Sequence, residues 1–90
     1  MNNQLTAETA VRDAWNATLR VESIAPQDTF FGLGGDSLSA IEVMESVETA
    51  LGIEFPLDVL FGEGTFAAVV HECASRFAQT SGTETHGSRA

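Results

Sequence analysis

This sequence contains no lysine, one cysteine and two prolines among its 90 residues. Without lysine it can form no Schiff base with a carbonyl substrate, and it has no phosphate-loop lysine. Cys73 is alone, so the chain forms no internal disulfide. No apolar run reaches membrane-spanning length and no signal peptide is recognised, so we expect a cytoplasmic protein without a membrane partner.

Positive charge is also scarce. Four arginines oppose thirteen acidic residues, which gives a formal net charge of −9. This charge repels phosphate backbones and anionic lipids, which excludes nucleic acid and membranes as expected partners. Hydrophobic residues make up 43% of the chain, a share typical of a folded domain. High charge on so small a body favours a monomer.

The apolar pattern predicts a single all-α domain over residues 6–78. The ends, residues 1–5 and 79–90, are polar and carry no apolar stripe, so we expect them to be disordered. No segment alternates long enough to indicate a strand. The expected fold is a small four-helix bundle, with three main helices and one short helix.

Four stretches carry the helical pattern. They cover residues 7–19, 37–51 and 57–61, and the segment that begins after Thr65. Thr6 and Thr65 are the expected N-caps of the first and last helices, and Gly52 is the expected C-cap of the second. Trp15 and Cys73 fall on apolar stripes, which places both in the predicted core.

A long connection, residues 21–36, joins the first two predicted helices. It is too long for a simple turn. Its large apolar side chains are expected to pack inward and to pin an ordered loop to the bundle. These side chains are Ile24, Phe30, Phe31 and Leu33.

The second predicted helix has an irregular distribution of apolar residues. Its core arc consists of Ala40, Val43, Met44, Val47, Ala50 and Leu51. The opposite, solvated side carries Glu42, Glu45 and Glu48. Leu38 and Ile41 project on this acidic side. They are either isolated surface aliphatics or a small apolar patch, ringed by acid, that a partner covers.

The segment that opens this helix, Gly34-Gly35-Asp36-Ser37-Leu38, places a hydroxyl in the first turn. Glycines permit positive φ and allow another surface to approach the backbone. Ser37 has two interpretations. It is an ordinary N-cap, or its hydroxyl holds a phosphate group in the partial positive charge of the helix start.

The sequence resembles carrier proteins, specifically the peptidyl carrier (thiolation) domains of nonribosomal peptide synthesis, through residues 30–38, FFGLGGDSL. Further matches follow the order of the family and cover nearly the whole predicted domain. They are Trp15, Asp28-Thr29, Leu51-Gly52-Ile53 with Phe55-Pro56-Leu57, Leu60-Phe61 and Thr65. The resemblance implies an acyl-carrier-protein-like bundle. It also implies a non-catalytic protein that holds an aminoacyl or peptidyl group as a thioester on a 4′-phosphopantetheine arm.

The resemblance further implies where the arm and the partners bind. A phosphopantetheinyl transferase would move the arm from coenzyme A to Ser37. The expected cofactor-binding residues are Ser37, as the covalent attachment site, with Gly35 and Asp36. The implied partners are this transferase, an adenylation enzyme, and condensation, tailoring or thioesterase-type enzymes. The expected partner-binding residues are Asp36, Leu38, Ile41, Glu42, Glu45 and Glu48.

An acyl carrier of the polyketide or fatty-acid type is the nearest alternative. Fatty-acid carriers usually have an acidic residue directly after the motif leucine, where this chain has Ser39. That departure weighs against a housekeeping acyl carrier. The acidic second helix, the start at Met1 and the polar tail suggest a discrete, free-standing carrier, and a domain excised from a longer protein is the other possibility.

A serine esterase is a more distant alternative, because Gly-Asp-Ser-Leu is also an esterase nucleophile motif. Such an enzyme needs a histidine and an acid near the serine, but Val69 stands two residues before His71, where the acid is common. The G-x-S-x-G motif also fails, since Ser39 replaces its last glycine.

Metal binding and a bare interaction module are also alternatives. His71, Glu72 and Cys73 are adjacent on one predicted helix, so their side chains point in different directions and we expect no metal site. An unmodified interaction module would leave the Gly-Gly-Asp-Ser-Leu cluster unexplained.

Overall fold

The computed structural model describes residues 3–87, with side chains described through residue 80. It contains the helices α1 (Asn3–Leu19), α2 (Ser37–Leu51), α3 (Leu57–Phe61) and α4 (Phe66–Gly87). Within the described residues there is no strand, only an isolated antiparallel bridge between Thr29 and Thr65. The predicted all-α fold is confirmed, including the bounds of α2 and α3.

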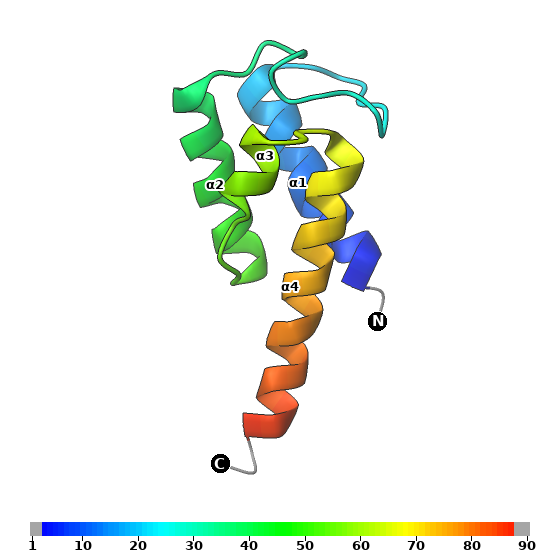
Figure 1. Cartoon of the computed structure of the whole chain (residues 1–90), viewed down its shortest axis with the longest axis vertical. Helices are drawn as coiled ribbons and strands as arrows, with labels where there is room; N and C mark the ends of the chain where they lie inside the picture. The colour runs from blue at the N-terminus through cyan, green and yellow to red at the C-terminus, as the bar shows by residue number, and fades with distance from the viewer. Residues whose placement is uncertain (1–2, 88–90) are drawn as a thin grey trace.

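The helices form a small bundle around α1. Helix α1 packs against α4 on one side and α2 on the other, and the short α3 bridges α2 and α4. The long loop between α1 and α2 arches over one end of the bundle, while the C-terminal part of α4 projects beyond the other end (Figure 1). No helix in the described range combines the length and hydropathy that a membrane span requires.

Trp15 is at the centre of the core. Its ring is fully buried and meets Phe30 and Phe66 edge-on, with 5.3 Å between ring centroids in each case. Helix α2 contributes Ala40, Val43, Val47 and Leu51 to the core, as its apolar arc predicted. Met44 is half-buried. Ala50 is exposed, contrary to prediction, because it lines an open groove between the end of α2 and the first half of α1.

The long loop is held to the start of α4 by backbone hydrogen bonds. Phe30 N donates to Gly64 O at 2.9 Å, and Phe66 N donates to Asp28 O at 2.8 Å. Arg12 adds a side-chain bond from α1, donating to Ile24 O at 3.3 Å. The loop is ordered, as predicted.

The packing of the loop's apolar side chains matches the prediction with one exception. Ile24 and Phe30 are buried and Leu33 is half-buried. The inward packing expected of Phe31 is wrong: its side chain is 41% exposed. Phe30 fills the space against Trp15, so Phe31 turns to the surface, where its ring stacks on Phe61.

Two helix ends differ from the prediction. Helix α1 begins at Asn3, so Thr6 lies inside the helix instead of capping it. Helix α4 continues to Gly87, past the end of its apolar stripe. Once a helix is nucleated, each further residue adds one backbone hydrogen bond, which extends it past its apolar stripe. Residues 1–2 and 88–90 of the predicted disordered ends lie outside the described range.

The other predicted caps are confirmed. Ala68 N donates to Thr65 Oγ1 at 3.2 Å, which caps the first turn of α4. Gly52 ends α2 in the left-handed conformation, with φ of 67°, and its N–H donates to Glu48 O.

Candidate functional site

Ser37 is the first residue of α2, and its side chain is exposed. Its hydroxyl makes no hydrogen bond within the described part of the chain. The N-cap is Asp36, whose backbone is extended at φ −143° and ψ −174°. Ser37 is therefore not the cap, and its hydroxyl is free to react with an approaching molecule.

Asp36 and Ser39 form a reciprocal capping box at the start of α2. Ser39 N donates to Asp36 Oδ1 at 2.9 Å, and Asp36 N donates to Ser39 Oγ at 2.7 Å. The Ser39 hydroxyl also lies 2.9 Å from Asp36 Oδ1. The Ser39 backbone N–H, followed by the Ser39 hydroxyl, holds the pKa of Asp36 below its ordinary value. A stable negative charge therefore sits next to Ser37.

The glycines before Asp36 have specific steric roles. Gly34 adopts φ of 101°, a conformation that residues with a β-carbon rarely take. A β-carbon on Gly35 would overlap the ring of Phe30, which passes directly beneath the loop backbone. Gly35 N also donates to Phe30 O at 3.0 Å. The core ring of Phe30 and the two glycines together bring the chain to the start of α2.

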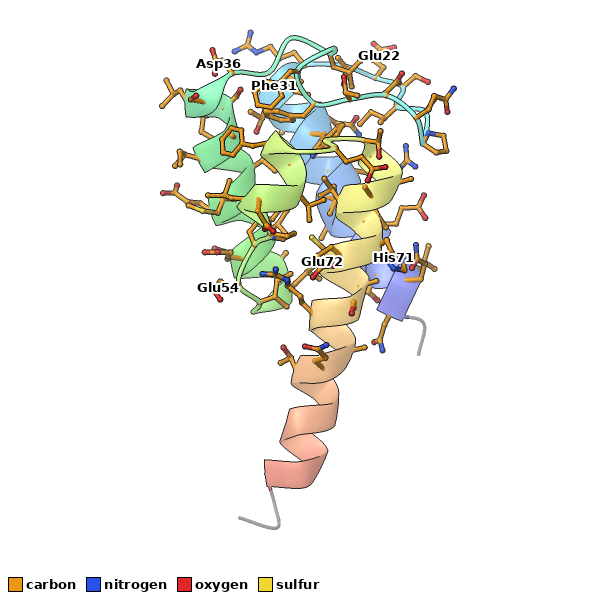
Figure 2. The ribbon with its side chains drawn as sticks, viewed as in Figure 1. Glu22, Phe31, Asp36, Glu54, His71 and Glu72 are labelled. Atoms are coloured by element: carbon orange, nitrogen blue, oxygen red, sulfur yellow. The ribbon has the colours of Figure 1, made fainter. Side chains whose placement is uncertain are left out.

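Apolar side chains are exposed near this helix start, as the sequence predicted. Leu38 is 70% exposed and Ile41 is 40% exposed. The apolar pattern did not indicate a second exposed pair, Phe31 and Phe61. These rings stack with 5.6 Å between centroids and 22° between planes, and Figure 2 shows Phe31 at the same end of the bundle as Asp36.

One signal in the sequence could have located this pair. Phe30 and Phe31 are adjacent residues of a loop, and in an extended or turning chain two successive side chains seldom face the same way. The adjacency of Phe30 and Phe31 therefore indicates that one of these two rings faces outward. Phe61 is the last residue of a five-residue helix, and Gly62 follows it.

The three glutamates predicted to bind partners have different environments. Glu42 and Glu45 are exposed. Glu48 is half-buried, and its Oε2 accepts a hydrogen bond from Phe55 N at 2.9 Å. Glu48 therefore has a structural role in holding the loop after α2, which the helical pattern did not indicate.

The residues required by the esterase alternative do not come together. His71 is exposed on α4, and Figure 2 shows it well away from Asp36 at the start of α2. Cys73 is buried in the core, where desolvation raises its pKa to about 12, so it is a poor nucleophile. Among the residues with described side chains, no three metal-binding side chains form a cluster.

Comparison with known families gives a direct match. A family model described as a phosphopantetheine attachment site matches residues 9–73. One subunit of the linear gramicidin synthase of Brevibacillus parabrevis is 40% identical over 68 residues, which cover 76% of this chain. Tyrocidine synthase 3 of the same organism is 35% identical over 79 residues, or 88% of the chain.

Similarity also extends to a polyketide enzyme. Polyketide synthase PksN of Bacillus subtilis is 40% identical over 62 residues, which cover 69% of this chain. The chain spans only about 1% of the length of each of these three relatives. No solved structure matches the chain.

Proposed function

Because the chain belongs to the phosphopantetheine attachment family, we propose that Ser37 is the residue that carries the 4′-phosphopantetheine arm. One observation carries this proposal: the Ser37 hydroxyl is exposed and, within the described chain, unpaired at the first residue of α2, while the neighbouring Asp36 caps the helix. The resemblance to peptidyl carrier domains is confirmed by the family match and by the gramicidin and tyrocidine synthase relatives.

The residues around Ser37 fit such an arm. A phosphodiester on Ser37 Oγ would lie at the helix start, whose partial positive charge favours an anion. No β-carbon is present at Gly34 or Gly35 to obstruct the approach of the transferase. Asp36 Oδ1 accepts hydrogen bonds from the backbone N–H and the hydroxyl of Ser39, so this oxygen is already used in the helix cap.

The modification forms a phosphodiester. The oxygen–hydrogen bond of Ser37 is replaced by an oxygen–phosphorus bond to the arm, and adenosine 3′,5′-bisphosphate leaves coenzyme A. The transferase supplies the metal and the base that accepts the Ser37 proton. The arm ends in a thiol, which holds an acyl group as a thioester.

We propose that the chain itself is a non-catalytic carrier. Its contribution would be tethering, since a covalently held group is presented to successive enzymes at high effective concentration. The proposed partners are a phosphopantetheinyl transferase, an adenylation enzyme, and condensation, tailoring or thioesterase-type enzymes. The expected cytoplasmic location, monomeric state and free-standing form stay predictions.

The proposed partner surface surrounds the attachment residue. It includes the predicted Asp36, Leu38, Ile41, Glu42 and Glu45, and we add the exposed rings of Phe31 and Phe61. Apolar side chains would give contact area, and the glutamates would steer the carrier to basic patches over a range of about 8 Å at physiological salt. Glu48 would contribute less, because its carboxylate is bonded to Phe55 N.

For the cargo, we propose an aminoacyl or peptidyl group, since the relatives include gramicidin and tyrocidine synthases. The similarity to polyketide synthase PksN supports an acyl group of the polyketide type as the second candidate. The protein that carries the arm is incubated with an adenylation enzyme, ATP and the amino acid, or with an acyltransferase and its acyl-coenzyme A. The mass of the product distinguishes the two kinds of cargo.

The attachment itself is tested by intact mass. The protein is incubated with coenzyme A, magnesium and a broad-specificity phosphopantetheinyl transferase, and we expect it to gain the mass of one arm. Ser37→Ala should gain nothing, whereas Ser46→Ala, which removes another exposed serine of α2, should gain one arm. An equal gain in Ser37→Ala, or no gain in the unaltered protein, would contradict the proposal.

A further inference from the structure

Helix α2 has two adjacent residues that could cap it. Aspartate and serine are both among the preferred N-cap residues, and Asp36 directly precedes Ser37. If Ser37 were the cap, its backbone would be extended and its hydroxyl would accept a hydrogen bond from the N–H of Ser39 or Ala40. A hydroxyl held in this way is less available to an incoming enzyme.

The side chain of Ser39 stabilises only one of these two possible N-caps. In the observed structure Ser39 is the third helical residue, and its Oγ accepts the N–H of Asp36 at 2.7 Å. If the helix were capped by Ser37, the third helical residue would be Ala40, which has no side-chain acceptor. Only the cap at Asp36 therefore gains the reciprocal bond of a capping box.

We infer that Ser39 is a positioning residue, which frees the Ser37 hydroxyl for modification by holding the helix cap at Asp36. The inference rests on the proposed function of Ser37. Ser39 acts through Asp36, because Ser39 N and Oγ both lie 2.9 Å from Asp36 Oδ1. These contacts also keep the carboxylate turned towards Ser39 instead of towards the Ser37 hydroxyl.

Three variants test this inference with the same transferase reaction. Ser39→Ala removes the hydroxyl, and Ser39→Thr keeps it. Thr65→Ala is the matched control, because it removes a side-chain cap of another helix, the bond from Ala68 N to Thr65 Oγ1.

The variants should differ in turnover more than in KM. We expect Ser39→Ala to lower kcat about fivefold, which equals about 1 kcal/mol at 1.4 kcal/mol per factor of ten, with KM within about twofold. Ser39→Thr and Thr65→Ala should keep both constants within about twofold of the unaltered protein.

The chemical shift of the Ser37 Cα measures the cap position without any modification. We expect a helical shift in the unaltered protein and in Ser39→Thr, and a change towards the extended value in Ser39→Ala. A helical shift that persists in Ser39→Ala would overturn the inference. So would an unchanged kcat in Ser39→Ala, or an equal loss in Thr65→Ala.

Failure of the proposed function has a different signature. In that case the unaltered protein would gain no arm in the transferase reaction, whatever the result for the Ser39 variants. The Ser37 chemical shift would then still decide whether Ser39 holds the cap at Asp36.

Discussion

The carboxylate of Glu48 accepts a hydrogen bond from the backbone N–H of Phe55, with 2.9 Å between Oε2 and N. Phe55 is buried, so its N–H would lack a partner if this side chain were absent. The bond ties the segment after Gly52 back onto α2 and thereby positions α3. A residue on the acidic side of α2 thus stabilises the end of the bundle that is remote from Ser37.

Removal of this carboxylate should destabilise the fold. We expect Glu48→Ala to lower the free energy of unfolding by about 1–2 kcal/mol, because a charge-assisted bond is lost and a buried N–H is left unpaired. Glu45→Ala removes an exposed glutamate of the same helix and should change stability by less than about 0.5 kcal/mol. Denaturant unfolding measures both, and equal losses would contradict the structural role of Glu48.

Substitutions on the two faces of α2 should separate docking from folding. Leu38→Asp and Ile41→Asp lie on the exposed face and should slow transfer of the arm, with stability changed by less than about 1 kcal/mol. Val47→Asp should unfold the domain, because it puts an unpaired charge into the core. Circular dichroism and the rate of mass gain measure the two effects. A loss of several kcal/mol in Ile41→Asp would show that this side chain supports the core.

The adjacent Phe30 and Phe31 should respond very differently to truncation. Phe30→Ala leaves a cavity at a fully buried site beside Trp15 and should lower the free energy of unfolding by about 3–5 kcal/mol. Phe31→Ala removes a half-exposed ring and should cost about 1 kcal/mol, while slowing reactions with partner enzymes. Thermal unfolding and loading rates test this difference. Similar stability losses in the two variants would contradict the observed packing.

Gly35→Ala should strain the approach to Ser37. The β-carbon of the alanine would overlap the ring of Phe30, so we expect the free energy of unfolding to fall by about 1–3 kcal/mol. The double variant Gly35→Ala with Phe30→Leu tests the cause, because a smaller side chain at residue 30 relieves the overlap. The two losses should be less than additive in denaturant unfolding. Strict additivity would mean that Phe30 is not the source of the strain.

Cys73 should be inert in the folded protein. Burial raises its pKa from 9.0 to about 12, so the thiol stays neutral in neutral solution. We expect iodoacetamide to label the folded protein at pH 8 at least about a hundredfold more slowly than the urea-unfolded protein. Labelling at equal rates would contradict this burial. After modification, the same reagent should label the thiol of the arm, which mass spectrometry distinguishes from Cys73.

The same pKa predicts a loss of stability in alkali. Because the folded pKa is raised above the unfolded value, the contribution of the protonated thiol is fully present below pH 9.0 and is lost as the pH rises towards about 12. Cys73→Ala should unfold with less dependence on pH in this range. An unchanged dependence would assign the alkaline loss to other groups.

Much of the fold followed from local patterns. The helical spacing of apolar residues predicted the bounds of α2, and Gly52 marked its end. The same spacing placed Trp15 and Cys73 in the core. The capping box was also within reach of the sequence, because Asp36 and Ser39 have the spacing of an N-cap and its third helical residue.

Other features depended on residues that are distant along the chain or on the space around them. Phe30 and Phe31 are the same residue type at adjacent positions. Only the fold shows that the Phe30 ring is buried close to Gly35, whereas the Phe31 ring is exposed. The helix ends at Asn3 and Gly87 lie beyond the apolar stripes, where hydrogen bonding of the backbone extends a helix that no pattern marks.

The amino-acid sequence by itself determined an acidic four-helix domain with a serine at the start of its second helix. Periodicity, caps and the carrier motif are local properties, which need no knowledge of the packing. Only the tertiary structure decided that Phe31 stacks outward on Phe61 and that Glu48 binds Phe55 N. These contacts join separate elements, and they form only where the folded chain brings both partners into the same space.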